Sequence, residues 1–456
     1  MPLAMARRND EEALTRAAPW WRFDRPMSQP PVQILGAGLT GMSAAYHLGD
    51  DCEVHEKQRR AGGHVVTDED RGFRFDRTGH LLHLRDPDIS SWVKQLLGED
   101  ALQISRRSRV FSHGTYTRYP YQANTFGLPP AVAYECLMGF LEALARREQM
   151  PEPASLEDYF LKFFGAGFSR HFMVPYNTKL WGVHPREITA DWCSRFVPLP
   201  TLEDVIAGAV GLGGRELGYN ATFTYPRRGI GTLSDAMRDL LGSTIRLGSA
   251  PRSIDWRAKR LIFEDRAVPY SVLISSAPLN KLVALLSGPP PEIIAAAAKL
   301  RCNGLYYLDV ALDVPCGVDL HWAYVPEERF PFYRVGCYSN FSAEMAPEAK
   351  ANLYVELSSR SPPDLRDLSP QIVQGLVEMG LVRSSDDVLF MRLRHMEHAY
   401  VVFDHEYYGA LACIQDFLTH ENILSAGRYG GWNYSSMEDA LIYGREAAVR
   451  ARALIG

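Results

Sequence analysis

The stretch that decides the fold of this chain is Val32-Gln33-Ile34-Leu35-Gly36-Ala37-Gly38-Leu39-Thr40-Gly41. It combines an apolar strand with a Gly-x-Gly-x-x-Gly loop, and a helix is expected to continue over 42–48. The three glycines permit a tight turn, a close backbone approach to a pyrophosphate, and close helix–strand packing. A second expected strand, 52–56, ends in a carboxylate suited to a ribose hydroxyl. The pattern predicts a Rossmann-type dinucleotide site formed by Gly36, Gly38, Leu39, Thr40, Gly41 and Glu56.

The composition limits the classes of protein to which this chain can belong. The chain has 456 residues, of which 46% are hydrophobic and 23% charged, and its formal net charge is −5. This length predicts two or three intertwined subdomains. Because the net charge is negative, the chain lacks the dominant basic field of a nucleic-acid-binding protein, so no nucleic acid is expected as a partner.

Neither disulfides nor a metal site is expected. The seven cysteines are irregularly spaced, which is typical of reduced thiols in a cytosolic protein. No run of 18 apolar residues occurs, so no membrane span is expected. Residues 1–29 carry charges throughout and lack the apolar core of a signal peptide, so they are expected to form a flexible arm. We therefore expect a cytoplasmic protein, and the sequence is compatible with an oligomer.

The patterning predicts an α/β fold, or α+β over the whole chain. Helices are expected over 129–148, 155–176, 201–211 and 436–454, and strands over 303–313, 322–325, 333–338 and 352–358. Ser435 and Glu438 are expected to form a capping box before the last helix. The expected domains are a flexible arm (1–29), a nucleotide-binding domain (30–78 with 218–300 and 385–456), a mainly helical substrate domain (79–217) and a β-rich substrate domain (301–384).

Two further segments favour FAD over NAD as the nucleotide. Lys57 directly follows the acidic residue and Gly62-Gly63-His64 comes soon after, while Ser425-Ala426-Gly427-Arg428-Tyr429-Gly430 precedes the last helix. Both segments resemble those of the flavin amine oxidase superfamily, in which a second helix N-terminus favours the negative charge of reduced flavin. The resemblance implies the two-domain fold of glutathione reductase and amine oxidases. It adds these cofactor-binding residues: Lys57, Gly62, Gly63, His64, Gly427, Arg428 and Met437.

Further motifs resemble the UDP-galactopyranose mutases, particularly the eukaryotic type, in order from about residue 32 to the C-terminus. They are Gly79–His83, Tyr119–Asn124, Pro175–Trp181 with Trp192 and Arg195, Asn220–Pro226, Trp322–Tyr324 with Pro331–Arg334, Glu397–Tyr400, and Arg428 with Trp432 and Tyr434. The resemblance implies catalytic roles for Arg195, Arg334, His80 and Tyr400. It implies substrate contacts for Tyr119, Gln122, Phe172, Asn177, Trp181, Asn220, Trp322, Tyr324 and Tyr434.

The chemistry of these side chains agrees with the resemblance. Guanidinium groups bind diphosphate oxygens bidentately, and each charge-assisted bond contributes roughly 1.5–3 kcal/mol. The resemblance implies that the enzyme interconverts the pyranose and furanose forms of a UDP-sugar or a related nucleotide sugar. In that family the N5 atom of reduced FAD attacks the anomeric carbon, and an external reductant such as NADPH first reduces the flavin.

The sequence departs from the family at three places, one of which is Ala123, where the uridine-binding segment of the family has its first asparagine. Ser435-Ser436-Met437-Glu438 stands where the family has an amide-containing segment, and a carboxylate there would repel phosphates, so Glu438 is expected to turn away as the helix cap. His83 replaces an aromatic residue that borders the sugar, so the sugar pocket is expected to differ. Two alternatives stay open: an FAD-dependent oxidase or desaturase of the amine oxidase or protoporphyrinogen oxidase type, and a flavoprotein that binds a nucleotide sugar without turnover.

Overall fold

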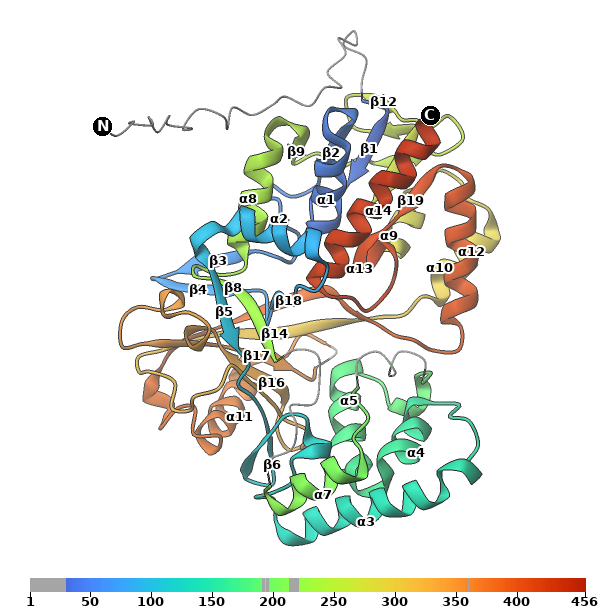
Figure 1. The fold of residues 1–456 in the computed structure, drawn as a ribbon. Helices are drawn as coiled ribbons and strands as arrows, with labels where there is room; N and C mark the ends of the chain where they lie inside the picture. Colours follow the sequence, from blue (N-terminus) through green and yellow to red (C-terminus); the bar gives the residue numbers. More distant parts are fainter. Residues whose placement is uncertain (1–29, 191–192, 194–196, 213–220, 360) are drawn as a thin grey trace, which may run out of the picture.

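A parallel sheet of five strands carries the glycine loop, in the upper part of Figure 1. The computed structural model describes residues 30–190, 193, 197–212, 221–359 and 361–456. The strands are β1 (Val32–Leu35), β2 (Cys52–Glu56), β9 (Ile245–Leu247), β13 (Val272–Ser275) and β19 (Ile423–Ser425). Their order is β19-β13-β1-β2-β9, and every neighbouring pair is parallel. The beginning and the end of the chain therefore meet in one sheet.

Glycine is required where α1 (Leu39–Leu48) leaves this sheet. A Cβ atom added at Gly41 would lie 1.9 Å from the carbonyl oxygen of Gly36. One added at Gly444, in the last helix α14 (Met437–Ile455), would lie 2.4 Å from the carbonyl oxygen of Thr40. Atoms in a packed interior do not approach so closely, so a side chain at either position would push α1 from its neighbours. These glycines hold α1 against the strand before it and against α14.

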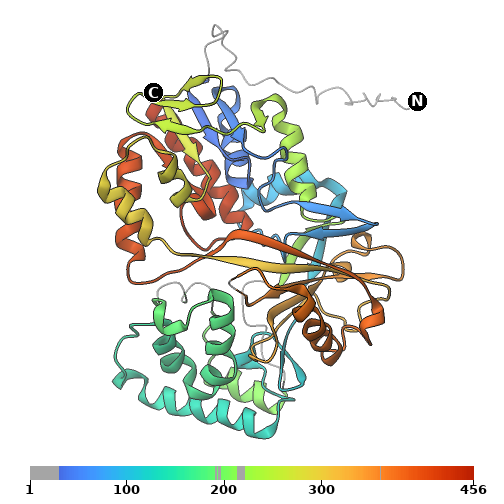
Figure 2. The same cartoon turned by 180° about the vertical axis from the view of Figure 1, so that it is seen from behind.

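A mixed sheet of seven strands crosses the middle of the molecule. Its strands are β6 (Ser108–Ser112), β7 (Thr115–Arg118), β14 (Cys302–Leu312), β15 (Trp322–Tyr324), β16 (Phe332–Cys337), β17 (Ala351–Leu357) and β18 (Val388–Val401). The order is β18-β14-β17-β16-β15-β6-β7, antiparallel except between β15 and β6. Figure 2 shows β14 and β18 as two long neighbouring strands between the parallel sheet and the helices below.

A group of helices forms the lower part of Figure 1. It contains α3 (Pro130–Arg146), α4 (Leu156–Phe168), α5 (Val174–Trp181) and α7 (Leu202–Val210), and a π-helical turn joins α4 to α5. Phe160, Phe164 and Phe168 recur every four residues on α4 and are fully buried, as one face of a helix requires. The α3 and α4 backbones lie in close contact because glycines occupy the contact on both helices.

The other elements connect these three parts. The remaining strands are β3 (Thr67–Asp70), β4 (Phe73–Asp76), β5 (Ala101–Ser105), β8 (Thr222–Pro226), β10 (Ser253–Asp255), β11 (Arg260–Ile262) and β12 (Ala267–Pro269). The remaining helices are α2 (Pro87–Leu97), α8 (Gly231–Leu241), α9 (Leu279–Leu285), α10 (Pro291–Lys299), α11 (Leu365–Glu378), α12 (Tyr407–His420) and α13 (Gly427–Gly430). None of the helices in the described ranges is long and apolar enough to span a bilayer.

The predicted helices and strands are confirmed as α3, α4 with α5, α7, α14, β14, β15, β16 and β17. The structure differs from the expected domain boundaries in two places. Strands β6 and β7, from the segment expected to be mainly helical, belong to the seven-stranded sheet, and so does β18, from the segment assigned to the nucleotide-binding domain. The reason is β-ladder pairing across the chain, since β18 pairs with β14 from Cys302 to Leu312.

The predicted capping box is wrong by one residue. The hydroxyl of Ser436 accepts from the backbone N–H of Asp439, and the Asp439 carboxylate accepts from the backbone of Ser436. Glu438 instead lies buried and accepts hydrogen bonds from the backbone N–H groups of Arg85 and Asp86. The residue expected to cap α14 therefore joins this helix to a distant loop.

Lys179 of α5 joins the helices to the seven-stranded sheet. Its ammonium group donates to the carbonyl oxygens of Val325, Glu327 and Phe332, at 3.2, 2.5 and 2.9 Å. These carbonyls belong to the hairpin between β15 and β16. Burial lowers the pKa of Lys179 to about 7, but the three carbonyls satisfy all three N–H donors of the charged form. The hairpin is therefore fixed to the helical part through one side chain.

We expect Lys179→Met to lower the free energy of unfolding by about 2–4 kcal/mol, because three carbonyl groups lose a charged donor. Urea unfolding followed by circular dichroism measures this effect. Lys94→Met, on the exposed face of α2, is the matched control and should leave stability within about 0.5 kcal/mol of wild type. Equal stabilities of the two variants would contradict a structural role for the Lys179 contacts.

Candidate functional site

A cavity of about 1070 Å³ lies where the parallel sheet meets the seven-stranded sheet. Its walls come from the glycine loop, the end of β2, the loops around His64 and His80, the strands β15, β16 and β18, and the segment from α13 to α14. Residues far apart in the sequence therefore form this site together.

The end of the cavity at the parallel sheet fits a dinucleotide. A Cβ atom at Gly38 would meet no protein atom within 4 Å, although the surrounding glycine positions are tightly packed, so the loop leaves room beside its backbone. The carboxylate of Glu56 accepts from the backbone N–H groups of Ala37 and Gln58, at 2.8 and 2.9 Å. These bonds fix the carboxylate, and each oxygen keeps a lone pair for a ribose hydroxyl.

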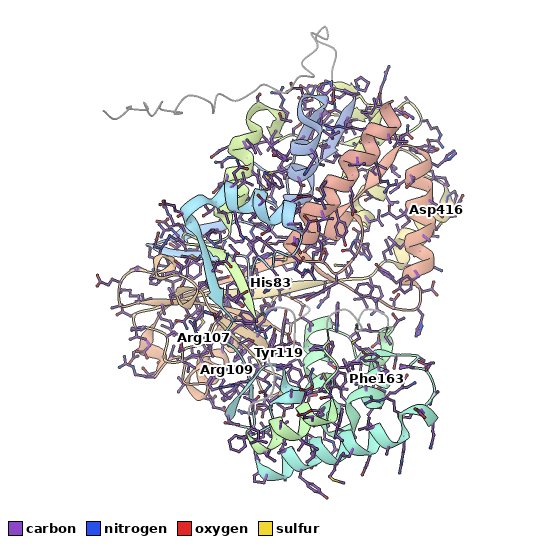
Figure 3. The ribbon with its side chains drawn as sticks, in the orientation of Figure 1. His83, Arg107, Arg109, Tyr119, Phe163 and Asp416 are labelled. Atoms are coloured by element: carbon purple, nitrogen blue, oxygen red, sulfur yellow. The ribbon has the colours of Figure 1, made fainter. Side chains whose placement is uncertain are left out.

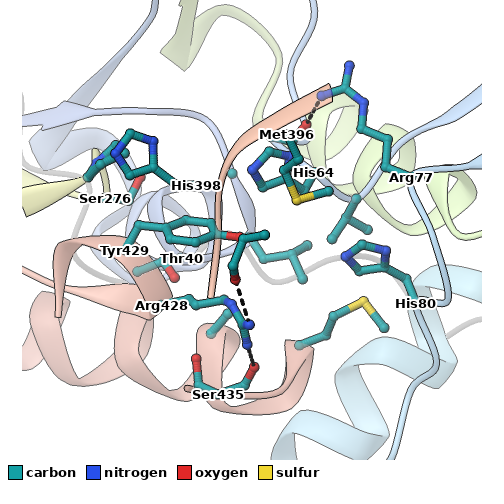
Figure 4. Close-up of a pocket in the computed structure, with 18 of the residues that line it drawn as sticks. Thr40, His64, Arg77, His80, Ser276, Met396, His398, Arg428, Tyr429 and Ser435 are labelled. Atoms are coloured by element: carbon teal, nitrogen blue, oxygen red, sulfur yellow. Dashed lines mark hydrogen bonds between the residues drawn. The ribbon is translucent and has the colours of Figure 1, made fainter. Parts of the chain in front are cut away.

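Buried polar atoms without a protein partner line the middle of the cavity. The Nδ1 atoms of His64 and His80 and the hydroxyl of Ser435 have no hydrogen-bond partner among the described residues. Burial, with nearby positive groups, lowers the pKa of His64 to about 3 and that of His80 to about 4. Figure 4 shows these side chains around one space. Neutral imidazoles and a hydroxyl left unpaired in this way call for a polar ligand.

Arg428 supplies a fixed positive charge to the same space. Its guanidinium donates to the carbonyl oxygens of Ser435, at 2.6 Å, and Ala399, at 2.9 Å, as Figure 4 shows. Its carbon Cζ lies 4.8 Å from the ring centroid of Tyr434 and 5.6 Å from that of Tyr400. No carboxylate within the described ranges forms an ion pair with it, so its charge is available to an anionic ligand.

The wall at the seven-stranded sheet carries a second cation. Cross-strand pairing places Tyr324, Arg334 and Glu356 side by side on β15, β16 and β17. The guanidinium of Arg334 donates twice to the fully buried Glu356, at 2.9 and 2.5 Å, and once to the hydroxyl of Tyr400, at 3.2 Å. Burial raises the pKa of Tyr400, so its hydroxyl stays protonated and can donate. Arg334 is thus held rigidly at the cavity wall.

The cavity brings together most of the residues singled out from the sequence. Its lining includes Gly36, Gly38, Leu39, Thr40, Glu56, Lys57, Gly62, Gly63, His64, His80, Tyr119, Trp322, Tyr324, Arg334, Tyr400, Arg428, Tyr434 and Met437. Gly41 and Gly427 lie behind this lining. A Cβ atom at Gly427 would lie 2.5 Å from the hydroxyl oxygen of Thr40, so this glycine lets α13 approach the glycine loop.

Four residues expected to contact the substrate lie outside the lining: Gln122, Phe172, Asn177 and Trp181. Gln122 donates to the carbonyl oxygen of Pro198 at 2.8 Å, and Asn177 accepts from the indole of Trp181 at 3.1 Å. Phe172 stacks between two tyrosine rings. Three of these side chains contact neighbours within the helical part, whereas the ring of Trp181 lies 5.8 Å from that of the lining residue Tyr400, and the substrate contacts of all four stay a prediction. Arg195, Asn220 and Trp192 lie outside the described residues.

Other lining residues escaped the sequence analysis. They include Arg77, Arg106, Lys281, Tyr354 and Tyr429. Arg77 donates to the carbonyl oxygen of Gly63, and Tyr354 lies so close to Gly79 that a Cβ atom there would be 2.5 Å from its hydroxyl. Arg77 directly precedes the Thr78-Gly79-His80 segment, and this position next to a motif could have identified it from the sequence. Nothing in the sequence around Tyr354 distinguishes it from a core residue.

Solved structures resemble this one over nearly its whole length. A structure of reduced UDP-galactopyranose mutase has a TM-score of 0.87 and 27% identity, and the match covers 94% of this chain and 95% of that one. A putative protoporphyrinogen oxidase from Exiguobacterium sp. has a TM-score of 0.70 at 14% identity, covering 94% of this chain and all of that one, and so shares the fold.

Two curated relatives match shorter segments. A dTDP-fucopyranose mutase from Escherichia coli is 24% identical over 174 residues, 36% of this chain and 45% of the relative. A 15-cis-phytoene desaturase from Synechococcus elongatus is 34% identical over 98 residues, 20% of this chain and 21% of the relative. The matched segments thus span less than half of the length of either relative.

The family match covers most of the chain. The sequence fits the family described as flavin containing amine oxidoreductase over residues 39–452. The room beside Gly38, the held carboxylate of Glu56 and the unpaired polar atoms of the cavity agree with the flavin dinucleotide that this family binds, so FAD is the cofactor. The fold, the cavity and the sequence match establish that this chain belongs to the flavin-containing amine oxidoreductases, and within them it resembles the UDP-galactopyranose mutases.

Proposed function

We propose that this protein is a flavin-dependent nucleotide-sugar mutase, which interconverts the pyranose and furanose forms of a UDP-sugar or a related nucleotide sugar. The observation that carries the proposal is the rigid Arg334, held between Glu356 and Tyr400 on the wall opposite the dinucleotide end of one cavity. An amine or a polyene substrate has no use for a guanidinium there, but a diphosphate does. The likeness to the reduced UDP-galactopyranose mutase supports the same reading.

The chain's own residues divide the task. Arg334 and the hydroxyls of Tyr324, Tyr400 and Tyr434 hold the diphosphate, which keeps the departed nucleotide within reach while the sugar rearranges. Tyr119 and Trp322 supply aromatic faces further along the wall. His80, neutral at pH 7, offers a hydrogen-bonding group beside the cofactor without adding a charge. Arg195 and Asn220 keep their sequence-based assignments to the diphosphate and the substrate as part of this proposal.

Bound FAD would supply a nucleophilic, electron-rich centre in its reduced form, provided that an external reductant such as NADPH has reduced it. The protein contributes the electrostatic setting for that form. Arg428 faces the cavity without a carboxylate partner in the described ranges, and the N-terminus of α14, with Met437, lies in the same wall. A cation and a helix N-terminus both favour an anion over a neutral group.

The proposal is tested by anaerobic turnover. The purified holoenzyme is reduced with dithionite and incubated with UDP-galactopyranose, other UDP-sugars and dTDP-fucopyranose, and the nucleotide sugars are resolved by chromatography. We expect a furanose product from at least one sugar, formed only by the reduced enzyme. If every sugar is returned unchanged while an amine or a polyene is oxidised, the protein is an oxidase or desaturase instead.

We expect Arg334→Lys to lower kcat at least roughly tenfold with FAD still bound, because an ammonium group cannot make the two parallel bonds of a guanidinium. The lysine keeps a positive charge beside the buried Glu356, so the fold is retained, which the flavin absorbance spectrum checks. Arg329→Lys is the matched control, since Arg329 is an exposed residue of the same hairpin and pairs with Glu378. An unchanged kcat in Arg334→Lys would remove Arg334 from the diphosphate site.

For Arg428→Met we expect the midpoint reduction potential of the bound flavin to fall by roughly 30–60 mV. The reason is the loss of a nearby positive charge contributing about 1.5–3 kcal/mol to the reduced anion. Spectroelectrochemistry on the holoenzyme measures the shift. Arg428→Lys keeps the charge and should recover most of the potential. A potential that does not move in Arg428→Met would mean that this guanidinium does not act on the flavin.

A further inference from the structure

His83 occupies the part of the cavity wall between the flavin end and the seven-stranded sheet. It lines the cavity together with Arg106, Tyr119 and Trp322. Its ring packs against Phe223, which in turn contacts Trp322. Figure 3 shows His83 near the junction of the upper part with the sheet, above Tyr119. His80 and His83 line the same cavity from one short loop.

The hydrogen bonds of His83 determine which of its nitrogens carries the proton. Its Nδ1 lies 3.3 Å from the carbonyl oxygen of Thr222. A carbonyl can only accept, so Nδ1 is the N–H donor of this pair. Burial lowers the pKa of His83 to about 4, with Arg106 and Arg85 adding to the effect and the bond to Thr222 opposing it. The ring is therefore neutral at pH 7, and Nε2 carries a lone pair with no protein partner among the described residues.

The loop that carries His83 is held at several points. Leu82 exchanges two backbone hydrogen bonds with Thr224 of β8, at 3.2 and 2.9 Å. Glu438 of α14 accepts from the backbone N–H groups of Arg85 and Asp86 and pairs with the side chain of Arg85. Asp86 then caps α2 and pairs with Arg445, about two turns further along α14 than Glu438. Because the loop is held at these points and Nδ1 is bonded to Thr222, the Nε2 acceptor of His83 keeps a fixed direction.

We propose that His83 is a specificity-determining residue whose Nε2 accepts a hydrogen bond from one hydroxyl of the sugar, and that Glu438 is the positioning residue for its loop. The inference rests on the proposed nucleotide-sugar substrate. A neutral imidazole acceptor at this point of the wall favours a ligand with a hydrogen-bond donor there. It discriminates against the same sugar without that hydroxyl, because the complex would then lack this hydrogen bond.

Binding to the oxidised holoenzyme tests this proposal without requiring turnover. Dissociation constants are measured by calorimetry for UDP, UDP-galactopyranose and its 2-, 3-, 4- and 6-deoxy analogues. In wild type we expect one deoxy analogue to bind roughly tenfold more weakly than the parent sugar. In His83→Phe that ratio should fall to about 1, while the ratios at the other positions and the affinity for UDP alone stay unchanged.

Two further variants separate recognition from folding. His83→Gln keeps an amide donor for Thr222 and an oxygen acceptor for the sugar, and should restore part of the discrimination. Glu438→Gln keeps one acceptor for the two backbone N–H groups but turns an amide towards Arg85, so the same ratio should fall although His83 is intact. The flavin spectrum and the thermal midpoint show that each variant is folded and loaded.

The outcomes distinguish this proposal from the function on which it rests. If wild type binds nucleotide sugars but the deoxy ratios are the same in His83→Phe, the role of His83 is wrong and the mutase function stands. If no nucleotide sugar binds to wild type, both fail together. A wider panel includes sugars with N-acetyl and amino groups. If His83→Phe changes the relative affinity only for a sugar with such a group, and for none of the deoxy analogues, the assignment of a hydroxyl to His83 is overturned.

Discussion

The structure depends on backbones that approach each other more closely than any side chain allows. Gly41 lets α1 start directly against the glycine loop, and Gly444 lets α14 pack against α1. The second contact holds α14 beside the glycine loop, and Met437 at its start lines the cavity. The glycine loop supplies the cradle for a dinucleotide, and the segment from α13 to α14 supplies the cavity wall beside it. The site is therefore built by two ends of the chain that meet through glycine.

Charge is handled differently at the two cations of the cavity. Arg334 is paired with a fully buried carboxylate, whereas Arg428 is held by two carbonyl oxygens and aromatic rings. A paired guanidinium is fixed in direction and still has an unused N–H edge, which suits recognition of a diphosphate. A cation without a counter-ion creates a field that a ligand must neutralise. Arg334 thus provides a fixed orientation for a ligand, whereas Arg428, on the other side of Tyr400, provides an uncompensated positive charge.

Local signals in the sequence predicted the elements well, and distant contacts account for what they missed. The glycine loop, Glu56 and the buried phenylalanines of α4 are readable because spacing alone expresses their role. Ser435–Glu438 and Ser436–Asp439 both fit a capping pattern, and only the loop at Arg85 and Asp86 decides between them. Gln122 is assigned to the substrate by its motif, and its bond to the carbonyl oxygen of Pro198, 76 residues further along the chain, could not be read from the sequence.

The place of α14 has a consequence for synthesis of the protein. This helix carries Met437 in the cavity wall and Glu438 under the loop of His80 and His83, and it is the last element of the chain. A growing chain contains the helical part and all strands of the seven-stranded sheet before α14 is synthesised. It cannot close the cofactor cavity until α14 has emerged and packed on α1. Flavin uptake into a closed cavity is therefore a step that follows the synthesis and packing of α14.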